Sequence, residues 1–295
     1  MADGLRIDHY TAHEIAERVE NGGVAKVKLP WLSVMTLGVL AGGFIGLGAM
    51  YFTLVTADAQ LSFAVSRVMG GVVFSLGLIL VVVAGAELFT GNNLIIMAWV
   101  ANRVTTRQIL KNWAIVYAAN FVGAFGLAVL VFLSNHTSMA GGAVGQNALR
   151  IAAAKCTLPA NEAFFKGILC NVLVCLGVWL CLGGRNVFDK VVAVIFPISA
   201  FVAAGFEHSV ANMYFIPLGL LLRAHAAVPA GVDPSVLTWS NFAQNLIPVT
   251  LGNIVGGALM VGAVYWLVYR REVSAQGKPE SMPSPSAPKS QRPAA

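Results

Sequence analysis

Six apolar stretches, each long enough to cross a lipid bilayer, constrain the fold of this chain more than any other feature. A helical span needs about 20 mostly apolar residues. Stretches of this kind lie at 31–56, 66–103, 106–133, 163–182, 188–222 and 243–269, the second and fifth with an interruption. Only 11% of the residues are charged, against about a quarter in soluble domains. The sequence predicts an all-α integral membrane protein with six transmembrane helices.

The Lys and Arg residues lie at the ends of these spans and predict the orientation of the chain. Of the 19 residues, five fall on one side, namely Arg67, Arg150, Lys155, Lys166 and Arg223, and the rest fall on the side of the two termini. Cytoplasmic loops carry the excess of positive charge. We therefore expect an inner (plasma) membrane protein with both termini in the cytoplasm. The net charge of +6 is then a topology signal and requires no nucleic-acid partner.

Three parts follow from this pattern. Residues 1–29 form a predicted cytoplasmic segment with a short amphipathic helix, because Thr11 and Glu14 have capping-box spacing and apolar residues recur after them at helical intervals. Residues 30–271 form the six-helix transmembrane domain. Residues 272–295 are rich in Pro, Ser and Ala, which predicts a disordered cytoplasmic tail.

An internal repeat links the two interrupted stretches. Residues 84–92 and 204–212 both read A-G-x-E-x-x-x-x-N, at an offset of 120 residues, and 120–123 and 253–256 both read N-x-V-G, at an offset of 133. Three spans per repeat is an odd number, so the second copy crosses the membrane in the opposite sense. Such inverted pairs bring their broken helices, here the second and fifth, together near the midplane.

Two carboxylates and one imidazole fall at membrane depth, where a charge is costly and normally faces a partner or a wet cavity. We interpret Glu87 and Glu207 as anchors at the helix breaks, which accept hydrogen bonds from freed backbone N–H groups and from amides such as Asn171 or Asn212. His208 differs, because a neutral imidazole offers an N–H to an anion and titrates near neutral pH. We interpret it as a pore residue.

Other residues near the breaks have two interpretations each. Thr90 either exchanges a hydrogen bond with His208 or a substrate oxygen, or it caps the helix that restarts near Asn92. Four apolar residues of the flanking spans form either constrictions or ordinary packing: Phe74, Leu78, Val174 and Phe201.

The spans contain none of the residue sets that an enzyme or a metal site requires. Four cysteines are present without a CxxC or Cys/His spacing, so they are interpreted as buried apolar residues. There is no Ser/His/Asp set and no haem His pair. We expect no catalytic residue, no cofactor and no metal. A channel for a neutral solute such as water, glycerol or ammonia stays open as an alternative, although the paired Asn-Pro-Ala motif of aquaporins is absent.

Four motifs carry a resemblance to a known family: F-S-L-G-L-I-L at 74–80, G-A-E-L-F-T at 85–90, G-F-E-H-S-V-A-N-M at 205–213 and N-L-I-P-V-T-L-G-N-I-V-G-G at 245–257. They resemble the formate/nitrite transporter family. The resemblance implies an aquaporin-like six-helix protomer with an inverted 3+3 repeat. It also implies a homopentamer in membrane lipid, with one substrate pore in each protomer and a central hole outside the substrate path.

The resemblance also implies roles for particular residues. Thr90 and His208 lie on the two breaks and approach each other in the pore, while Lys155 supplies positive potential at the outer mouth. The remaining implied positions are the constriction residues Phe74, Leu78, Phe201 and Val174, the cytoplasmic narrowing at Leu88 and Phe89, the polar lining at Asn171, and Glu207 and Asn212 in support of His208.

The substrate is less closely defined. The motifs are most similar to those of the formate branch, whereas Gly91-Asn92-Asn93 departs from it, so nitrite, hydrosulfide and lactate stay open. A protonated weak acid crosses an apolar constriction at lower cost than a bare anion. We expect Lys155 to attract the anion and His208, directly or through water, to hydrogen-bond to it or protonate it. Transport then depends on protons.

Overall fold

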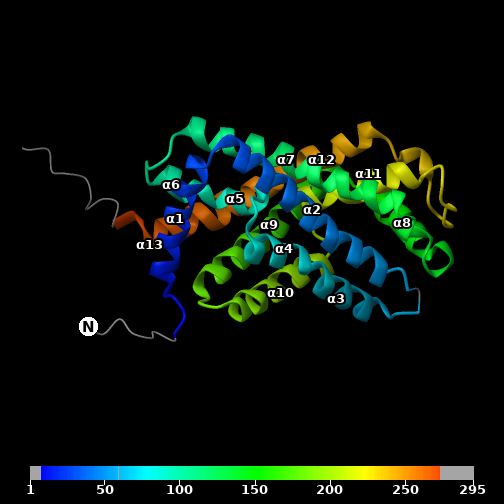
Figure 1. Cartoon of the computed structure of the whole chain (residues 1–295), viewed down its shortest axis with the longest axis horizontal. Coiled ribbons are helices and arrows are strands. Elements are labelled where there is room, and N and C mark those ends of the chain that lie inside the picture. The colour runs from blue at the N-terminus through cyan, green and yellow to red at the C-terminus, as the bar shows by residue number, and fades with distance from the viewer. Residues whose placement is uncertain (1–7, 59, 273–295) are drawn as a thin grey trace, which may run out of the picture.

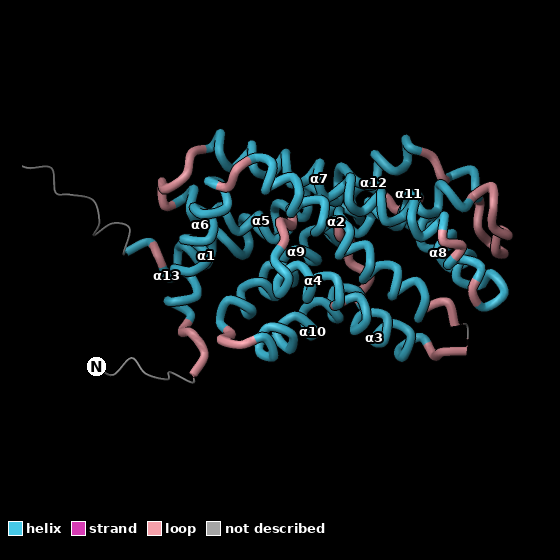
Figure 2. Tube along the Cα trace, in the orientation of Figure 1, coloured by secondary structure: helices cyan, strands magenta, loops and turns pink. Residues whose placement is uncertain are grey.

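The computed structural model describes residues 8–58 and 60–272, and every regular element within these ranges is helical (Figure 2). The predicted tail beyond residue 272 lies outside the described residues. Figure 1 shows an elongated bundle in which α1 (Ala12–Lys28) and α13 (Val264–Tyr269) lie at one end and α8 (Ala143–Cys156) lies at the other. The two ends of the described chain therefore share one end of the bundle.

The first helix begins with the capping box that its sequence predicts. The Glu14 N–H donates to Thr11 Oγ1 at 3.3 Å, and the Thr11 N–H donates to Glu14 Oε2 at 2.8 Å. Its apolar residues Ile15, Ala16 and Val19 are buried, in a cluster with apolar side chains of α6 (Ile96–Val100). This burial fixes α1 against the helical bundle.

The spans agree with the six apolar stretches. Unbroken passes are made by α2 (Trp31–Val55), α7 (Thr106–Leu133) and α9 (Ala160–Gly183). The last pass joins α12 (Trp239–Ile254), a π-helical segment (Val255–Ala263) and α13. With these, residues 63–85 make five helices that are long and apolar enough to cross a bilayer.

The second and fifth passes are broken. The second consists of α3 (Phe63–Phe74), α4 (Leu76–Leu80), a π-helical turn (Val81–Gly85), α5 (Phe89–Asn92), a 3-10 turn (Asn93–Ile95) and α6. The fifth consists of α10 (Val187–Ala203) and α11 (Ser209–Leu222). The predicted all-α fold with two inverted halves is confirmed.

Both breaks have the same backbone geometry. Gly85 and Gly205 adopt φ values of +83° and +73°, a left-handed conformation that favours glycine. Three non-helical residues follow in each half, at 86–88 and at 206–208, before the next helix begins. The paired glycines therefore let each helix stop inside the bundle and restart.

Glycines also bring the unbroken helices of each half into backbone contact. A Cβ on Gly123 of α7 would lie 1.9 Å from the Val39 carbonyl oxygen of α2, and a Cβ on Gly256 would lie 2.2 Å from the Ile168 oxygen of α9. Only glycine permits such an approach. The two contacts occupy equivalent places in the repeat.

Short elements join the spans at the end opposite α1. They are 3-10 turns at His136–Ser138, Ala140–Gly142 and Pro234–Val236, together with α8. Helix α8 packs against α11 and α12, and this packing positions Lys155, in its last turn, beside the second break.

Candidate functional site

The two breaks meet in one hydrogen bond. Thr90 Oγ1 lies 3.0 Å from His208 Nε2, and both side chains are buried. His208 Nδ1 accepts the Ala211 N–H at 3.1 Å and so caps α11. A nitrogen that accepts a backbone N–H carries no proton, so the neutral ring has its hydrogen on Nε2 and donates it to Thr90. Each half of the repeat thus supplies one member of this pair.

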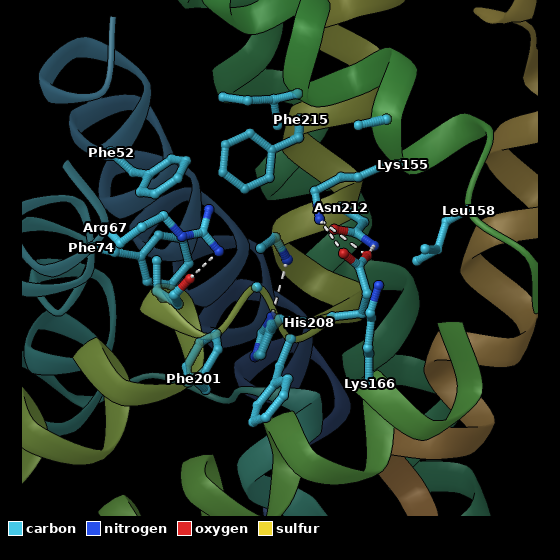
Figure 3. A pocket seen from close by; sticks show the side chains of 17 residues that line it. Phe52, Arg67, Phe74, Lys155, Leu158, Lys166, Phe201, His208, Asn212 and Phe215 are labelled. Atoms are coloured by element: carbon cyan, nitrogen blue, oxygen red, sulfur yellow. Dashed lines mark hydrogen bonds and ion pairs between the residues drawn. The ribbon is translucent and has the colours of Figure 1, made fainter. Parts of the chain in front are cut away.

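Two cavities lie beside the breaks. The first, here termed the Lys155 vestibule, has a volume of about 280 Å³ and is lined by Lys155, His208, Phe74 and Phe201, among others (Figure 3). The second, the Lys26 vestibule, has a volume of about 370 Å³, and its lining includes Lys26, Glu87, Leu78, Leu88 and Gly91. No residue lines both.

Thr90 separates these cavities. Thr90 is fully buried and lines neither cavity. Its hydrogen-bond partner His208 lines the Lys155 vestibule, and its neighbour in the chain, Gly91, lines the Lys26 vestibule. The bond between Thr90 and His208 therefore lies between residues that line the two cavities.

Apolar side chains line both vestibules beside the breaks. In the Lys155 vestibule the rings of Phe74 and Phe201 meet edge to face, with centroids 5.9 Å apart, and the Phe201 ring stacks on His208, also at 5.9 Å. Leu78 and Leu88 are buried at 2% and 3% exposure and line the Lys26 vestibule. These four residues line the vestibules, and their roles as constrictions stay predictions.

Two other predicted narrowing residues lie away from the cavities. Phe89 packs edge to face on Tyr117 and Trp113, with centroids 4.8 and 6.3 Å apart. Val174 is 1% exposed within the apolar core. Neither lines a vestibule, so their roles as pore residues stay predictions that the geometry of the cavities does not support.

A buried charged network anchors the second break. Lys155 Nζ lies 2.9 and 3.0 Å from the two carboxylate oxygens of Glu207. Asn212 Nδ2 donates to Glu207 Oε2 at 2.6 Å and to Asn245 Oδ1 at 2.7 Å. The carboxylate is thereby neutralised and held at the start of α11, beside His208.

The same network is present at the first break. Lys26 Nζ lies 2.5 Å from Glu87 Oε1, and Asn92 Nδ2 donates to Glu87 Oε2 at 2.7 Å and to Asn112 Oδ1 at 3.0 Å. The sequence reasoning did not select Lys26 as a site residue. It precedes Lys155 by 129 residues, and Asn112 precedes Asn245 by 133. A search of the repeat with a separate offset for each helix would have found both.

Two amides hold the restarted helices in place. Each side-chain oxygen accepts the N–H of the residue that begins the restarted helix, and each nitrogen donates to two backbone carbonyls. For Asn120 the partners are Phe89, Gly38 and Glu87, at 2.9, 2.8 and 2.9 Å. For Asn253 they are Ser209, Gly167 and Glu207, at 3.0, 2.8 and 3.0 Å. The frame around both breaks is therefore the same.

Comparison with known proteins agrees with this paired architecture. A family model described as formate/nitrite transporter matches residues 13–267. The chain belongs to the formate/nitrite transporter family.

Relatives within this family share most of the chain. Formate channel FocA of Escherichia coli (strain K12) is 43% identical over 267 residues, which cover 88% of this chain and 94% of FocA. A solved pentameric formate channel with formate bound is 38% identical, with a TM-score of 0.75, and covers 81% of this chain and 97% of its own. A solved channel described as an FNT family ion channel is 28% identical, with a TM-score of 0.77, and covers 86% and 98%.

Membership of this family makes the chain a multi-pass membrane channel or transporter and not an enzyme, as its sequence predicts. Within the described ranges no group of three or more His, Cys, Asp or Glu residues is arranged to hold a metal ion. The four cysteines are free thiols.

The polar residue Asn171 lies behind the break of this transporter. Its Nδ2 lies within hydrogen-bond distance of the Thr90 oxygen at 3.2 Å, Asn93 Oδ1 at 2.8 Å and the Asn253 oxygen at 2.7 Å. It is fully buried and lines neither vestibule. The structure therefore places Asn171 where it supports the backbone of Thr90, and its part in the pore lining stays a prediction.

Proposed function

We propose that this protein passes small monovalent anions, formate first among them, across the inner (plasma) membrane. The observation that carries the proposal is the bond between Thr90 and His208, which lies between two vestibules at the meeting point of the broken helices. Relatives described as formate channels, at 43% and 38% identity, support the substrate.

The orientation follows from charge. Both ends of the described chain lie at the end of the bundle that contains α1 (Figure 1), and most Lys and Arg residues belong to this side. The positive-inside rule makes it the cytoplasmic side. The Lys26 vestibule then opens to the cytoplasm and the Lys155 vestibule to the outside. Residues 30–271 form the channel domain.

The imidazole of His208 provides a hydrogen-bond donor to the anion in a passage that is lined largely by apolar side chains. A formate ion entering the Lys155 vestibule loses water as it nears Phe74 and Phe201, and a bare charge there is costly. The Nε2–H of His208 exchanges its Thr90 acceptor for a formate oxygen, directly or through water. A proton from the acidic side joins formate before it passes Leu78 and Leu88, so that the neutral acid crosses the narrow zone. Transport is then linked to protons.

Five protomers form the functional assembly. The solved relative is described as pentameric, and many large apolar side chains of this chain are exposed in the single protomer, among them Phe165, Phe188 and Phe196. Apolar side chains exposed in this way are covered by lipid or by neighbouring subunits in a membrane protein. We propose a homopentamer in which each protomer keeps its own pore.

The test is a flux measurement with purified protein in liposomes. Formate and nitrite influx are compared at acidic and neutral external pH, with His208→Phe as the control. The proposal predicts that formate flux dominates, rises as external pH falls and is lost in the variant. A nitrite or hydrosulfide flux larger than the formate flux would assign a different substrate to the same kind of channel. An absence of anion flux together with fast osmotic swelling would indicate a neutral-solute channel instead.

A further inference from the structure

The cations that line the Lys155 vestibule differ in how they are neutralised. Lys155 pairs with Glu207 at 2.9 Å, and Lys166 pairs with Glu162 at 3.1 Å. Arg67 lines the same vestibule and forms no ion pair with any carboxylate of residues 8–58 or 60–272. Arg67 is therefore the cation of this mouth whose charge is not balanced by a neighbour.

Backbone carbonyls fix the guanidinium group of Arg67 without neutralising it. Its Nε donates to the Ala203 oxygen at 2.7 Å, and its Nη2 donates to the Val202 oxygen at 3.3 Å, both at the carboxyl end of α10. Both carbonyls belong to the last turn of α10, where the Val202 oxygen also accepts the Gly205 N–H at 3.0 Å. Nη1 makes no hydrogen bond to a described residue, so one edge of the planar group stays available.

The break itself makes room for this side chain. A Cβ on Gly205 would lie 2.7 Å from Arg67 Nη2, so the glycine allows the guanidinium group to lie against the break. Figure 3 shows Arg67 and Lys155 reaching the pocket from opposite sides, with His208 between and below them. Arg67 and His208 therefore both face an anion that enters this vestibule.

The Lys26 vestibule lacks a counterpart. Its only lining charges among the described residues are Lys26 and Glu87, which pair with each other at 2.5 Å. The residue 120 positions after Arg67 is Val187, and a Cβ on Gly85, the equivalent of Gly205, would have no neighbour within 4 Å. The two mouths therefore share the Lys–Glu pair and differ in the additional cation.

We propose that Arg67 is the anion-loading residue of the Lys155 vestibule. Its unbalanced charge raises the local concentration of small monovalent anions at this mouth. Its free edge offers N–H donors to a carboxylate such as formate before the anion moves on to His208. Lys155, in contrast, acts mainly to hold Glu207. The inference rests on the proposed function and assigns the attracting charge to a different residue from the one that the sequence predicts.

The experiment compares sided fluxes of Arg67→Gln with those of wild type in right-side-out membrane vesicles. We expect the apparent KM for formate influx to rise about five-fold in low salt, the size expected for one unit charge a few ångströms away in a wet site. The difference should shrink at about 0.5 M salt, where charges are screened within about 4 Å. The KM for efflux should stay unchanged, because the Lys26 vestibule is neutral.

Two variants provide matched controls. Arg150→Gln removes the same charge from an exposed residue of α8 that does not line the vestibule, and it should leave both KM values unchanged. Arg67→Lys keeps the charge without the planar fork and should recover most of the influx KM. If Arg67→Gln does not assemble, Ile151→Glu places a carboxylate in the lining of the same vestibule and should raise the influx KM in the same salt-dependent way.

Several results would overturn the inference. An influx KM in Arg67→Gln equal to that of wild type would refute it, as would a change that is equal in both directions and independent of salt, which is the result expected for a packing role. A flat response of Ile151→Glu would also count against it. Absence of formate flux in wild type would instead refute the proposed function, and the inference with it.

Discussion

The two breaks have the same supports and different functional residues. Each has a left-handed glycine, a Lys–Glu pair and an amide that ties the break to a neighbouring helix. The two halves differ at positions of the breaks that do not belong to these supports. Leu88 stands where the second half has His208, and Val210 stands where the first half has Thr90. Both halves therefore share the means of stopping and restarting a helix, while the two residues that we propose for the pore, Thr90 and His208, stand at positions where the halves differ.

The supports also differ in their exposure to solvent. The side chain of Lys26 is 34% exposed and that of Lys155 is 14% exposed, whereas both carboxylates are below 10%. A buried ion pair depends strongly on both partners, because the survivor is left as a buried charge. The pair near His208 is thus more sensitive to loss of its lysine than the pair near Leu88.

The largest expected effect, on the stability of the protein, comes from the side-chain amides of Asn120 and Asn253. Replacing Asn120 or Asn253 with Leu removes three hydrogen bonds and leaves buried backbone groups unpaired. We expect a loss of about 3–9 kcal/mol of stability in each case, at about 1–3 kcal/mol for each of the three unsatisfied groups. Thermal unfolding in detergent and size-exclusion chromatography measure it. A stable assembly in one variant and an unfolded one in the other would contradict the equivalence of the halves.

A smaller effect is expected from the lysines of the two ion pairs. Lys155→Met leaves Glu207 buried without its partner and should destabilise the protein by about 3 kcal/mol. Lys26→Met should cost about 1 kcal/mol, because the more exposed site admits water and weakens the pair. Unfolding temperatures provide the measurement. Adding Glu207→Gln or Glu87→Gln in the same chain should restore stability, and failure of both rescues would show that the lysines act by packing alone.

The smallest of these changes is a single hydroxyl group. Thr90→Val keeps the shape of the side chain and removes the acceptor 3.0 Å from His208 Nε2, so the imidazole loses its resting partner. We expect formate flux in liposomes to fall about ten-fold, which corresponds to about 1.4 kcal/mol. Tyr117→Phe is the matched control. It deletes the hydroxyl that lies 2.8 Å from Thr250 Oγ1, in a pair that lines neither vestibule, and it should leave flux near wild type.

The residues that support the two breaks could be predicted from sequence where both halves of the repeat have identical residues at one of the two recognised offsets. Glu87 with Glu207, and Asn120 with Asn253, revealed the inverted pair and the two breaks. Lys26 and Lys155 were not paired, because their separation of 129 residues matches neither the offset of 120 nor that of 133. The resemblance implied that Lys155 supplies attracting positive potential, and the sequence did not show that this lysine pairs with Glu207.

Other features depend on directions that sequence does not contain. Phe89 and Thr90 are neighbours on the four-residue helix α5, and only the packed structure shows that the phenyl ring lies against Tyr117 while the hydroxyl group reaches His208. The partners of Arg67 are backbone carbonyls about 135 residues away, and no side-chain motif marks such a contact.

The comparison of the two breaks is tested most directly by making the second break carry the residue of the first. Formate flux of His208→Leu is measured in liposomes beside wild type, at equal amounts of folded protein and at acidic external pH. The account predicts that the variant assembles with the wild-type oligomeric state and that its formate flux falls to the level of empty liposomes. Formate flux that persists at the wild-type rate in the assembled variant would contradict a pore that passes His208.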